Sequence, residues 1–284
     1  MKNKIATIYL MGGFGNQIFQ LCFAKSLENL GLKVYIDTDN YLKKNIRRDV
    51  DVENRELTLP IDLYGFKKVP NYLKLLLFLN NKLRNYSFKN SKFLLVGRFN
   101  DKNFDGNFKT INQFVGYWQD IDLINDHKDF LLSKLAKEPK INESLTQDPI
   151  KGSTMIHVRR KDYLSMGEEL GLEYYKISIN LAKKNINNFY FDVFTDDKDW
   201  VLSNSIFSNA RNIFYSSSSR EDTIGAFSEM IKYENFIISN STFSLIPAML
   251  GKSKNKNVFV PEPWFRNLQS LKNYPESWRR IKNE

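Results

Sequence analysis

Between residues 154 and 260, short apolar runs alternate with segments whose apolar side chains recur at helical spacing. This alternation predicts parallel β-α-β units joined by right-handed crossovers, and therefore a Rossmann-like α/β domain. The strands are predicted at 154–158, 189–194, 212–215, 235–238 and 257–260, and the helices at about 173–184, 197–204, 222–232 and 242–250.

The N-terminus predicts a second unit of the same kind. The pattern indicates a strand over 5–10, a tight turn over Gly12–Gly15, a helix over Gln17–Leu30 and a strand over Lys33–Ile36. In such units the first turn brings backbone N–H groups to a ligand. The candidate residues of this turn are Gly13, Gly15, Asn16 and Gln17, although the spacing lacks the third glycine of a dinucleotide fingerprint.

The stretch from Asp39 to Asp148 has a weaker pattern, with a Leu-rich helix predicted near 72–83 and short strands near Phe93 and Phe114. Polar residues together with Pro149 and Gly152 make 140–152 the predicted linker. A chain of 284 residues fits two domains of average size. The predicted architecture is α/β with two Rossmann-like lobes facing a cleft, at 1–150 and 151–262, and a tail at 263–284 that packs on the lobes.

Composition narrows the function classes. A net charge of +10 favours an anionic partner: a nucleotide, a nucleic acid or an acidic membrane surface. The lysines are scattered and match no nucleic-acid-binding motif, which argues against nucleic acid. One cysteine and two histidines exclude a disulfide framework and disfavour a structural zinc site. With no signal peptide and no apolar stretch long enough to span a bilayer, we expect a cytoplasmic protein.

Arg159 and Arg160 directly follow the predicted strand 154–158 and open a predicted loop. A guanidinium stays charged at any working pH and presents a planar fork of donors, so an adjacent pair suits a diphosphate. A surface arginine pair that solvates a strand end is the alternative. The pair alone does not choose between these interpretations.

Two further polar clusters follow predicted strands. Asp196 and Asp197 come after the strand 189–194, where they could contact a base or sugar or could cap the next helix. Asn240, Ser241, Thr242, Phe243 and Ser244 come after the strand 235–238, and their hydroxyls and free helix N–H groups could hold a phosphate. In a parallel sheet these clusters and the arginines would line one edge. Together they predict a nucleotide-diphosphate site without a P-loop, as in a nucleotide-sugar transferase.

The chain resembles the bacterial α-1,2-fucosyltransferase family. The segment Gly12–Gln20 is similar to the family's N-terminal signature, and Gly116–Gln119 to a mid-chain one. The segment His157–Tyr163 matches the HxRRxDY motif position by position. Further matches follow in the family's order: Glu173-Tyr174-Tyr175, Thr195-Asp196-Asp197 with Trp200, Asn240–Ser244 and Pro263-Trp264-Phe265.

The resemblance implies a GT-B arrangement and metal-independent, inverting transfer of L-fucose from GDP-fucose to a galactose hydroxyl. It implies no cofactor besides the donor substrate. Arg159 and Arg160 would hold the diphosphate, Ser241–Ser244 would add phosphate contacts, Asp196 or Asp197 would contact guanine or ribose, and Gly13–Gln17 would lie near donor and acceptor. The implied acceptor is a galactose-containing glycan of O-antigen or capsule synthesis, which could be lipid-linked.

The sequence departs from the family after Ser244. Relatives commonly carry two tryptophans there, whereas this chain has Leu245-Ile246-Pro247. The departure leaves the detail of the donor pocket open. The diphosphate clamp is also blind to the sugar it carries, so transfer of another GDP-sugar is the alternative function.

For the proton of the acceptor hydroxyl, Asp162 is the first candidate acceptor and His157 the second. Asp162 could instead pair with Arg160, and His157 could be a hydrogen-bonded core residue. A dissociative transition state needs no dedicated base. Two classes outside the enzymes are disfavoured: a nucleic-acid-binding protein by the scattered lysines and the lack of a binding motif, and a non-catalytic sugar-binding lobe by the strand-end arginines and the hydroxyl cluster. Basic runs at Lys252–Lys256 and Arg279-Arg280 could hold the protein at an anionic inner membrane.

Overall fold

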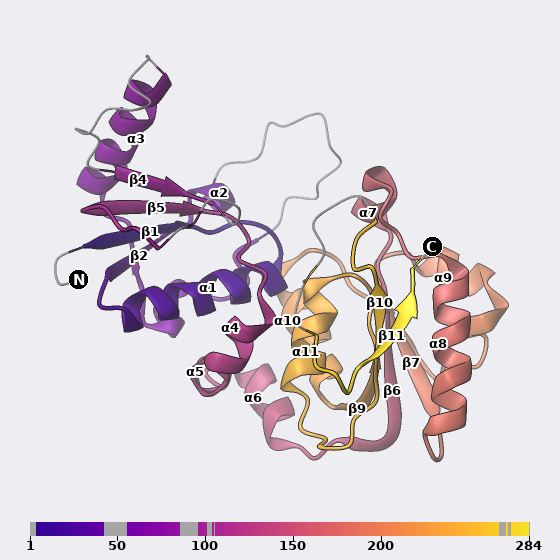
Figure 1. Ribbon diagram of the computed structural model, residues 1–284. Coiled ribbons are helices and arrows are strands. Elements are labelled where there is room, and N and C mark those ends of the chain that lie inside the picture. Colours follow the sequence, from indigo (N-terminus) through magenta and orange to yellow (C-terminus); the bar gives the residue numbers. More distant parts are fainter. Residues whose placement is uncertain are drawn as a thin grey trace. The chain divides into compact units, whose positions relative to one another are not determined.

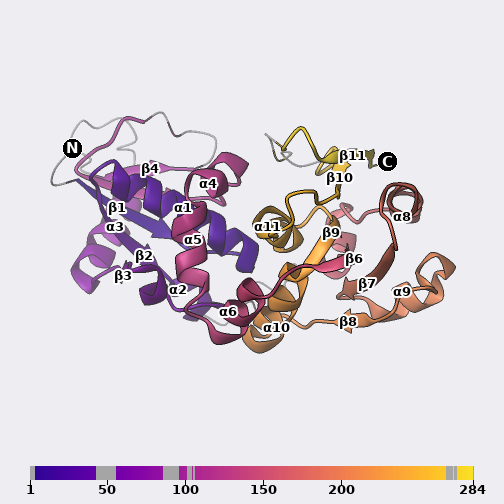
Figure 2. The same ribbon diagram turned by 90° about the horizontal axis from the view of Figure 1, so that it is seen from below.

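The computed structural model describes residues 4–42, 56–85, 96–100, 104, 106–266, 271 and 274–283. The chain divides into two compact units, a first unit of Met1–Asn45 with Leu59–Gln119 and a second unit of Ile46–Thr58 with Asp120–Glu284. Each unit is built on a parallel sheet (Figures 1 and 2). The predicted α/β class with two Rossmann-like lobes is confirmed.

The first unit holds a five-stranded parallel sheet in the order β3-β2-β1-β5-β4. Its strands are β1 (Ile5–Tyr9), β2 (Lys33–Asp37), β3 (Lys67–Lys68), β4 (Val96–Phe99) and β5 (Ile111–Val115). Its helices are α1 (Phe14–Asn29), α2 (Asp39–Leu42), the 3-10 turn η1 (Ile61–Tyr64) and α3 (Asn71–Asn85). The central strand β1 is buried through its middle, as a strand covered on both faces must be.

The second unit holds a six-stranded parallel sheet in the order β11-β10-β9-β6-β7-β8. Its strands are β6 (Ile150–Val158), β7 (Tyr190–Thr195), β8 (Ile213–Tyr215), β9 (Tyr233–Ile237), β10 (Val258–Glu262) and β11 (Arg279–Lys282). Its helices are α4 (Ile121–Asp126), α5 (Lys128–Leu135), α6 (Pro139–Thr146), α7 (Lys161–Met166), α8 (Leu172–Asn185), α9 (Lys198–Ser203), the 3-10 turn η2 (Ser205–Phe207), α10 (Arg220–Ile231) and α11 (Thr242–Leu250).

Each sheet contains a topological switch point. In the second unit the chain runs from β6 outward through β7 to β8, and β9 then pairs on the other side of β6. In the first unit it runs from β1 through β2 to β3, and β5 then pairs on the other side of β1. Helix connections leave such a strand pair in opposite directions, which opens a crevice at the carboxyl ends of the strands. The fold therefore singles out the edge beside β6 and β9 and the edge beside β1 and β5.

The predicted linker at 140–152 is mostly regular structure: residues 140–146 belong to α6 and 150–152 to β6, and 147–149 form the irregular connection. Pro139 occupies the first turn of α6, where a proline is tolerated, and Ile141 is buried. Gly152 lies inside β6 at an irregularity of its pairing with β9, at φ 73°, and an added Cβ would lie 2.7 Å from the carbonyl oxygen of Asn188. Gly152 thus marks a bulge inside β6, whereas Pro149 lies in the irregular segment 147–149 between α6 and β6.

The compact units also divide the chain elsewhere than at residue 150. Residues 120–150 cluster with the second unit because α6 packs against α10. The tail adds the strand β11 to the second sheet beside β10. The predicted loop after Arg160 is wrong as well, because α7 begins at Lys161 with Arg160 as its N-cap residue. The strand predicted near Phe93 lies outside the described residues.

Candidate functional site

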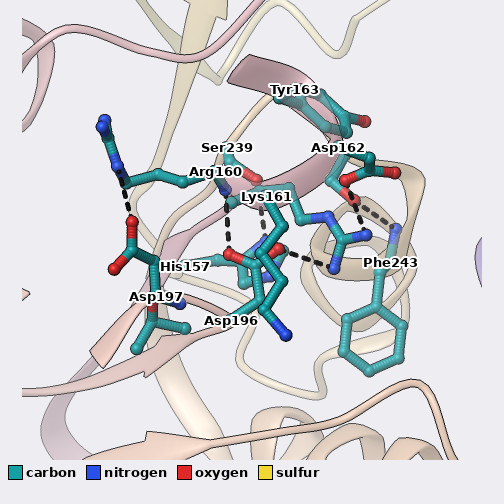
Figure 3. Close-up of polar contacts among 12 residues, drawn as sticks. His157, Arg160, Lys161, Asp162, Tyr163, Asp196, Asp197, Ser239 and Phe243 are labelled. Carbon is teal, nitrogen blue, oxygen red and sulfur yellow. Dashed lines mark hydrogen bonds and ion pairs between the residues drawn. The ribbon is translucent and has the colours of Figure 1, made fainter. Parts of the chain in front are cut away.

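The three predicted clusters meet at one edge of the second sheet. Arg159 and Arg160 follow β6, Asp196 and Asp197 follow β7, and the segment from Ser239 follows β9. These strands are neighbours in the order β9-β6-β7, and β6 and β9 form the switch point. Figure 3 shows the side chains that converge there. The prediction that the clusters share an edge is confirmed.

Arg159 is held between two carboxylates. Its Nη2 lies 2.7 Å from Asp162 Oδ1, and its Nη1 lies 2.9 Å from Asp196 Oδ2. The side chain of Asp196 is only 4% exposed, whereas that of Asp162 is 15% exposed. Asp196 therefore fixes Arg159 from the buried side, and Asp162 pairs with it from the more open side. The alternative that Asp162 pairs with Arg160 is wrong, because its ionic partner is Arg159.

Arg160 is fixed at three points. Its backbone N–H donates to Asp196 Oδ1 at 2.9 Å, and its Nε donates to Asp197 Oδ2 at 3.1 Å (Figure 3). Its guanidinium carbon lies 4.1 Å from the centroid of the Trp200 ring, a cation–π distance. The indole contact and the Nε bond to Asp197 together fix the position of the planar guanidinium. Such an arrangement prepares Arg160 to bind an anion bidentately.

Asp197 caps a helix, one of the two roles predicted for the aspartate pair, and it also binds Arg160; contact of either aspartate with a base or sugar stays a prediction. Its Oδ1 accepts the backbone N–H of Trp200 at 3.1 Å, which caps α9, while its other oxygen binds Arg160. The side-chain hydroxyl of Thr195 in turn accepts the backbone N–H of Asp197 at 2.9 Å. The helix cap and the arginine contact are therefore mechanically linked.

Burial shapes the electrostatics of this edge. Desolvation raises the pKa of Asp196 above its ordinary value although Arg159 and the Arg160 N–H oppose the shift. Desolvation by itself lowers the pKa of Arg159, but the carboxylates of Asp196 and Asp162 outweigh it, so that pKa is raised. Arg159 consequently carries its positive charge throughout the accessible pH range.

His157 belongs to the core behind the arginines. It is 4% exposed, and its Nδ1 shares a 2.7 Å hydrogen bond with the hydroxyl of Ser239. Burial, and secondarily the charge of Arg159, lowers its pKa from 6.5 to about 3. A proton acceptor works best with a pKa near the working pH, so this imidazole is a poor general base. The geometry favours the core alternative for His157.

The hydroxyl cluster after β9 is engaged locally. Ser241 Oγ accepts the backbone N–H of Phe243 as the N-cap of α11, and Ser244 Oγ donates to the Ser241 carbonyl at 3.2 Å. Asn240 is fully buried, and its side chain donates to the carbonyl of Glu168 at 2.6 Å. Thr242 is buried at the first position of the helix. Phosphate contact by these residues stays a prediction, with the start of α11 as its structural basis.

Sequence reasoning missed Glu168, which is completely buried. Its Oε2 accepts the backbone N–H of Arg266 at 2.7 Å, and its carbonyl holds Asn240. It thereby ties α7 to the tail and to the start of α11. The signal in the sequence was Gly167, whose positive φ of 66° ends α7 and turns the chain inward at Glu168.

Two aromatic motifs of the resemblance brace this region. The Tyr174 hydroxyl donates to the carbonyl of Ile238 at 2.5 Å, and the Tyr175 hydroxyl donates to the carbonyl of His157 at 3.3 Å. Trp264 is 1% exposed. The two tyrosines thus support the ends of β6 and β9 from inside the fold, and Trp264 packs with the rings of Phe265 and Tyr274.

The switch point of the first unit is lined by amides instead of charges. Gly13 is the N-cap of α1 and supplies no side-chain cap. Gln17 Nε2 donates to the Gly12 carbonyl at 3.2 Å, and Gln119 Nε2 donates to Asn16 Oδ1 at 2.7 Å. The last bond joins the turn after β1 to the turn after β5. Gly15 is buried in the first turn of α1.

Within the described ranges, no group of three or more His, Cys, Asp and Glu side chains is arranged to hold a metal ion. Among the helices of those ranges, none is long and apolar enough to cross a membrane.

Comparison with known proteins gives one family. The family model for glycosyl transferase family 11 matches residues 1–282. An alpha-1,2-colitosyltransferase from Escherichia coli is 30% identical over 298 residues, which cover 98% of this chain and 99% of that protein. The O-antigen biosynthesis glycosyltransferase WbnK of Escherichia coli is 26% identical over 95% of this chain and 98% of its own.

The solved structures that align with this chain share less sequence identity with it. A GDP complex of a mutant of Arabidopsis thaliana FUT1 aligns with 93% of this chain and 72% of its own at 13% identity and a TM-score of 0.46. The fucosyltransferase NodZ from Bradyrhizobium aligns with 88% of this chain and 93% of its own at 12% identity and a TM-score of 0.44.

Proposed function

The chain belongs to glycosyl transferase family 11, and from this premise we propose that it transfers L-fucose from GDP-fucose to a galactose hydroxyl, with inversion and in a 1,2 linkage. As a glycosyltransferase it takes a nucleotide-sugar donor and a glycan acceptor. The observation that carries the proposal is the arginine pair after β6, fixed at the switch point of the second sheet. The HxRRxDY motif and the 1,2 specificity in the name of the Escherichia coli relative support it.

The arginines account for donor binding and for departure of the leaving group. A GDP diphosphate is anionic, and two oxygens of one phosphate can accept two parallel N–H groups of a guanidinium such as that of Arg160 or Arg159. As the bond between the anomeric carbon and the phosphate oxygen breaks, its electron pair moves to GDP and the negative charge grows. Preorganised cationic donors stabilise this charge more than they stabilise the bound donor, and so lower the barrier.

Aspartates already neutralise the arginines before a donor enters. The incoming diphosphate therefore has to replace a carboxylate on Arg159. Asp162 is the one to leave, because its side chain is the more exposed and Asp196 also holds the Arg160 N–H. We assign Asp162, once released, as the acceptor of the proton from the attacking hydroxyl. The new bond joins that oxygen to the anomeric carbon on the face opposite the departing GDP, which inverts the β-linked donor to an α-linked product.

The acceptor and setting follow from the relatives. The resemblance implies a β-galactoside, and WbnK is named for O-antigen biosynthesis. We therefore propose a galactose-containing glycan of O-antigen or capsule assembly, which could be lipid-linked. The proposed chemistry is metal-independent and uses no cofactor besides the donor, because Arg159 and Arg160 supply the positive charge.

Colitosyl transfer is the second candidate, because the 30% identical relative is named a colitosyltransferase. Colitose is fucose without its 3-hydroxyl, so one hydroxyl distinguishes the two donors. A site built to bind that hydroxyl rejects the deoxy sugar strongly, whereas a site without such a contact accepts both sugars.

The test is GDP release by the purified chain, with and without lactose, in the presence of EDTA. Donors are GDP-fucose, GDP-colitose, GDP-mannose and UDP-galactose. Lactose-stimulated release from GDP-fucose, with an α-1,2 linkage in the product by NMR, is the expected result. Preference for GDP-colitose establishes the second candidate. Loss of activity in EDTA that Mg²⁺ restores, or preference for UDP-galactose, overturns the proposed chemistry.

A further inference from the structure

Helix α3 of the first unit carries an apolar stripe on its exposed side. Tyr72, Leu75, Leu76 and Leu79 follow the spacing i, i+3, i+4, i+7 and are 59%, 58%, 47% and 46% exposed. Residues at this spacing lie on one face of a helix. Isolated exposed leucines are ordinary, but a continuous stripe of large apolar side chains marks an interaction surface.

The stripe is not needed for the core of the unit. The opposite face of α3 carries Leu73 and Leu77, which are 0% and 4% exposed. Leu73 packs in a cluster with Tyr35 and Val69. A helix that already buries one apolar face and carries a second one is placed between two apolar environments. Against the described residues of this unit the stripe stays exposed, which leaves it open to an external partner.

The charge around the stripe indicates what that environment is. Residues 67–85 contain five basic residues and no acidic residue: Lys67, Lys68, Lys74, Lys82 and Arg84. Of these, Lys74 forms an ion pair with Asp39 of α2. Lys67 and Lys68 form β3, directly before the helix, and both are exposed. Apolar side chains flanked by lysines suit the boundary between headgroups and acyl chains of an anionic bilayer.

We propose that α3 docks the protein onto an anionic lipid bilayer, lying in the plane of the interface with Tyr72, Leu75, Leu76 and Leu79 inserted. A helix of 15 residues is about 22 Å long and falls short of the hydrocarbon core of about 30 Å, so it lies on the bilayer and does not cross it. A symmetric dimer through the same face would bring two segments that contain basic and no acidic residues together, which opposes that occupant.

The basic runs noted in the sequence are less suited to this role. Lys252 donates to the Gln147 carbonyl, and Lys256 donates to the carbonyls of Met249 and Gly251 at the end of α11. Arg280 pairs with Glu262. These side chains are directed onto their own unit, and no apolar stripe accompanies them. The docking surface is therefore α3.

The first experiment is cosedimentation of the full chain with vesicles of phosphatidylethanolamine and phosphatidylglycerol, beside neutral phosphatidylcholine vesicles. The test variant is Leu75→Asp with Leu79→Asp. The matched control is Leu202→Asp, at an equally exposed leucine of α9 (61%). We expect the wild type and control to bind the anionic vesicles, and the test variant to bind about tenfold or more weakly. GDP release with soluble lactose should be equal in all three, which separates docking from the proposed transfer reaction.

A labelled variant tests the same surface without disturbing it. The native Cys22 is fully buried, so a polarity-sensitive dye can be attached at Leu76→Cys, with Leu202→Cys as control. A blue shift on adding anionic vesicles is expected at position 76 alone. The proposal is overturned by unchanged cosedimentation of the aspartate variant, by the absence of binding and of any shift at position 76, or by a wild-type dimer that the variant dissociates.

Discussion

The two sheets present the same topological feature with opposite chemistry. At the switch point of the second sheet, two guanidinium groups face three carboxylates, those of Asp162, Asp196 and Asp197. At the switch point of the first sheet, glycines and the amides of Asn16, Gln17 and Gln119 occupy the corresponding turns. A charged edge stabilises a diphosphate, whereas a neutral edge of amides and close-packed backbone suits groups without charge. The same topology thus presents charged groups in one sheet and neutral groups in the other, and only the side chains differ.

Removing an arginine should have the largest effect. In Arg160→Ala we expect kcat/KM for GDP-fucose to fall about a hundred- to a thousandfold, because a preorganised donor to the leaving diphosphate is lost. The protein should stay folded, since the partner Asp197 is 27% exposed and can be hydrated. Steady-state GDP release and circular dichroism measure the two effects.

The matched control is Arg211→Ala. Arg211 also stacks on an aromatic ring, 4.4 Å from the centroid of Tyr190, but it precedes β8 at the opposite end of the sheet. It should keep wild-type turnover. Equal activity of Arg160→Ala and Arg211→Ala would show that the charged edge has no role in catalysis.

In Arg159→Ala the buried Asp196 loses its ionic partner, so we expect the free energy of unfolding to fall by about 3–5 kcal/mol.

Loss of the Asp196 carboxylate, which holds Arg159, should reduce activity less than loss of Arg160. Asp196→Asn keeps the shape but removes the charge that faces Arg159 Nη1. We expect kcat/KM to fall about ten- to a hundredfold through misplacement of the guanidinium. Asp199→Asn, in the first turn of α9, is the control and should keep wild-type turnover. An Asp196→Asn enzyme with full activity would show that the carboxylate only neutralises the resting site.

The role of the neutral edge of the first sheet can be tested by adding a methyl group at one of its glycines. Gly12 has φ 81°, and an added Cβ would lie 2.7 Å from Asn16 Nδ2 and 2.9 Å from Tyr117 Cε1. Gly31 has φ 84° with nothing within 4 Å of such a Cβ. Both alanine variants carry backbone strain of about 1–3 kcal/mol, seen in denaturant unfolding. Only Gly12→Ala should also impair turnover with lactose. Equal turnover of the two variants would exclude a role for this edge.

Acid sensitivity gives the smallest effect. The folded-state pKa of His157 is about 3 against an ordinary value of 6.5, so folding excludes its proton. Above pH 6.5 the imidazole is neutral in both the folded and the unfolded state, so the free energy of unfolding is not reduced. As the pH falls from 6.5 toward about 3, only the unfolded state binds the proton, and the free energy of unfolding decreases. At pH 5 the loss is about 2 kcal/mol. His157→Gln should lack this loss in urea unfolding at neutral and acid pH, whereas His127→Gln should retain it. Identical pH dependence of the His157→Gln variant and the wild type would contradict the buried neutral imidazole.

Local patterns predicted most of the regular structure because each element carries its own periodicity. The strand at 154–158, the helix at 242–250 and the turn at Gly12–Gly15 all rest on residues adjacent in sequence, and the structure has β6, α11 and the start of α1 there. The linker predicted at 140–152 is irregular only over 147–149, because a glycine such as Gly152 gives the same local signal in a loop as in a strand bulge. The boundary of the compact units failed for a related reason, since packing of α6 on α10 leaves no local signal.

The candidate site was predicted in its residues but not in its pairings. The sequence identified Arg159, Arg160, Asp196 and Asp197, because charged residues directly after buried strands are unusual. It did not predict that Asp162 would pair with Arg159, nor that Glu168 would bind the Arg266 N–H across 98 residues of chain. Contacts between distant residues depend on which strands become neighbours, and periodicity carries no information about that.

The sequence by itself determined the α/β class, the family, the basic charge and the residues that could bind a diphosphate, because these follow from residue identity and local spacing. Only the tertiary structure decided that β9 lies beside β6, which creates the switch point at Arg159 and Arg160. It also decided that α3 buries Leu73 and exposes Leu75. Both outcomes depend on how separate elements share one core, since burial against distant chain selects one arrangement among many that the same local pattern permits.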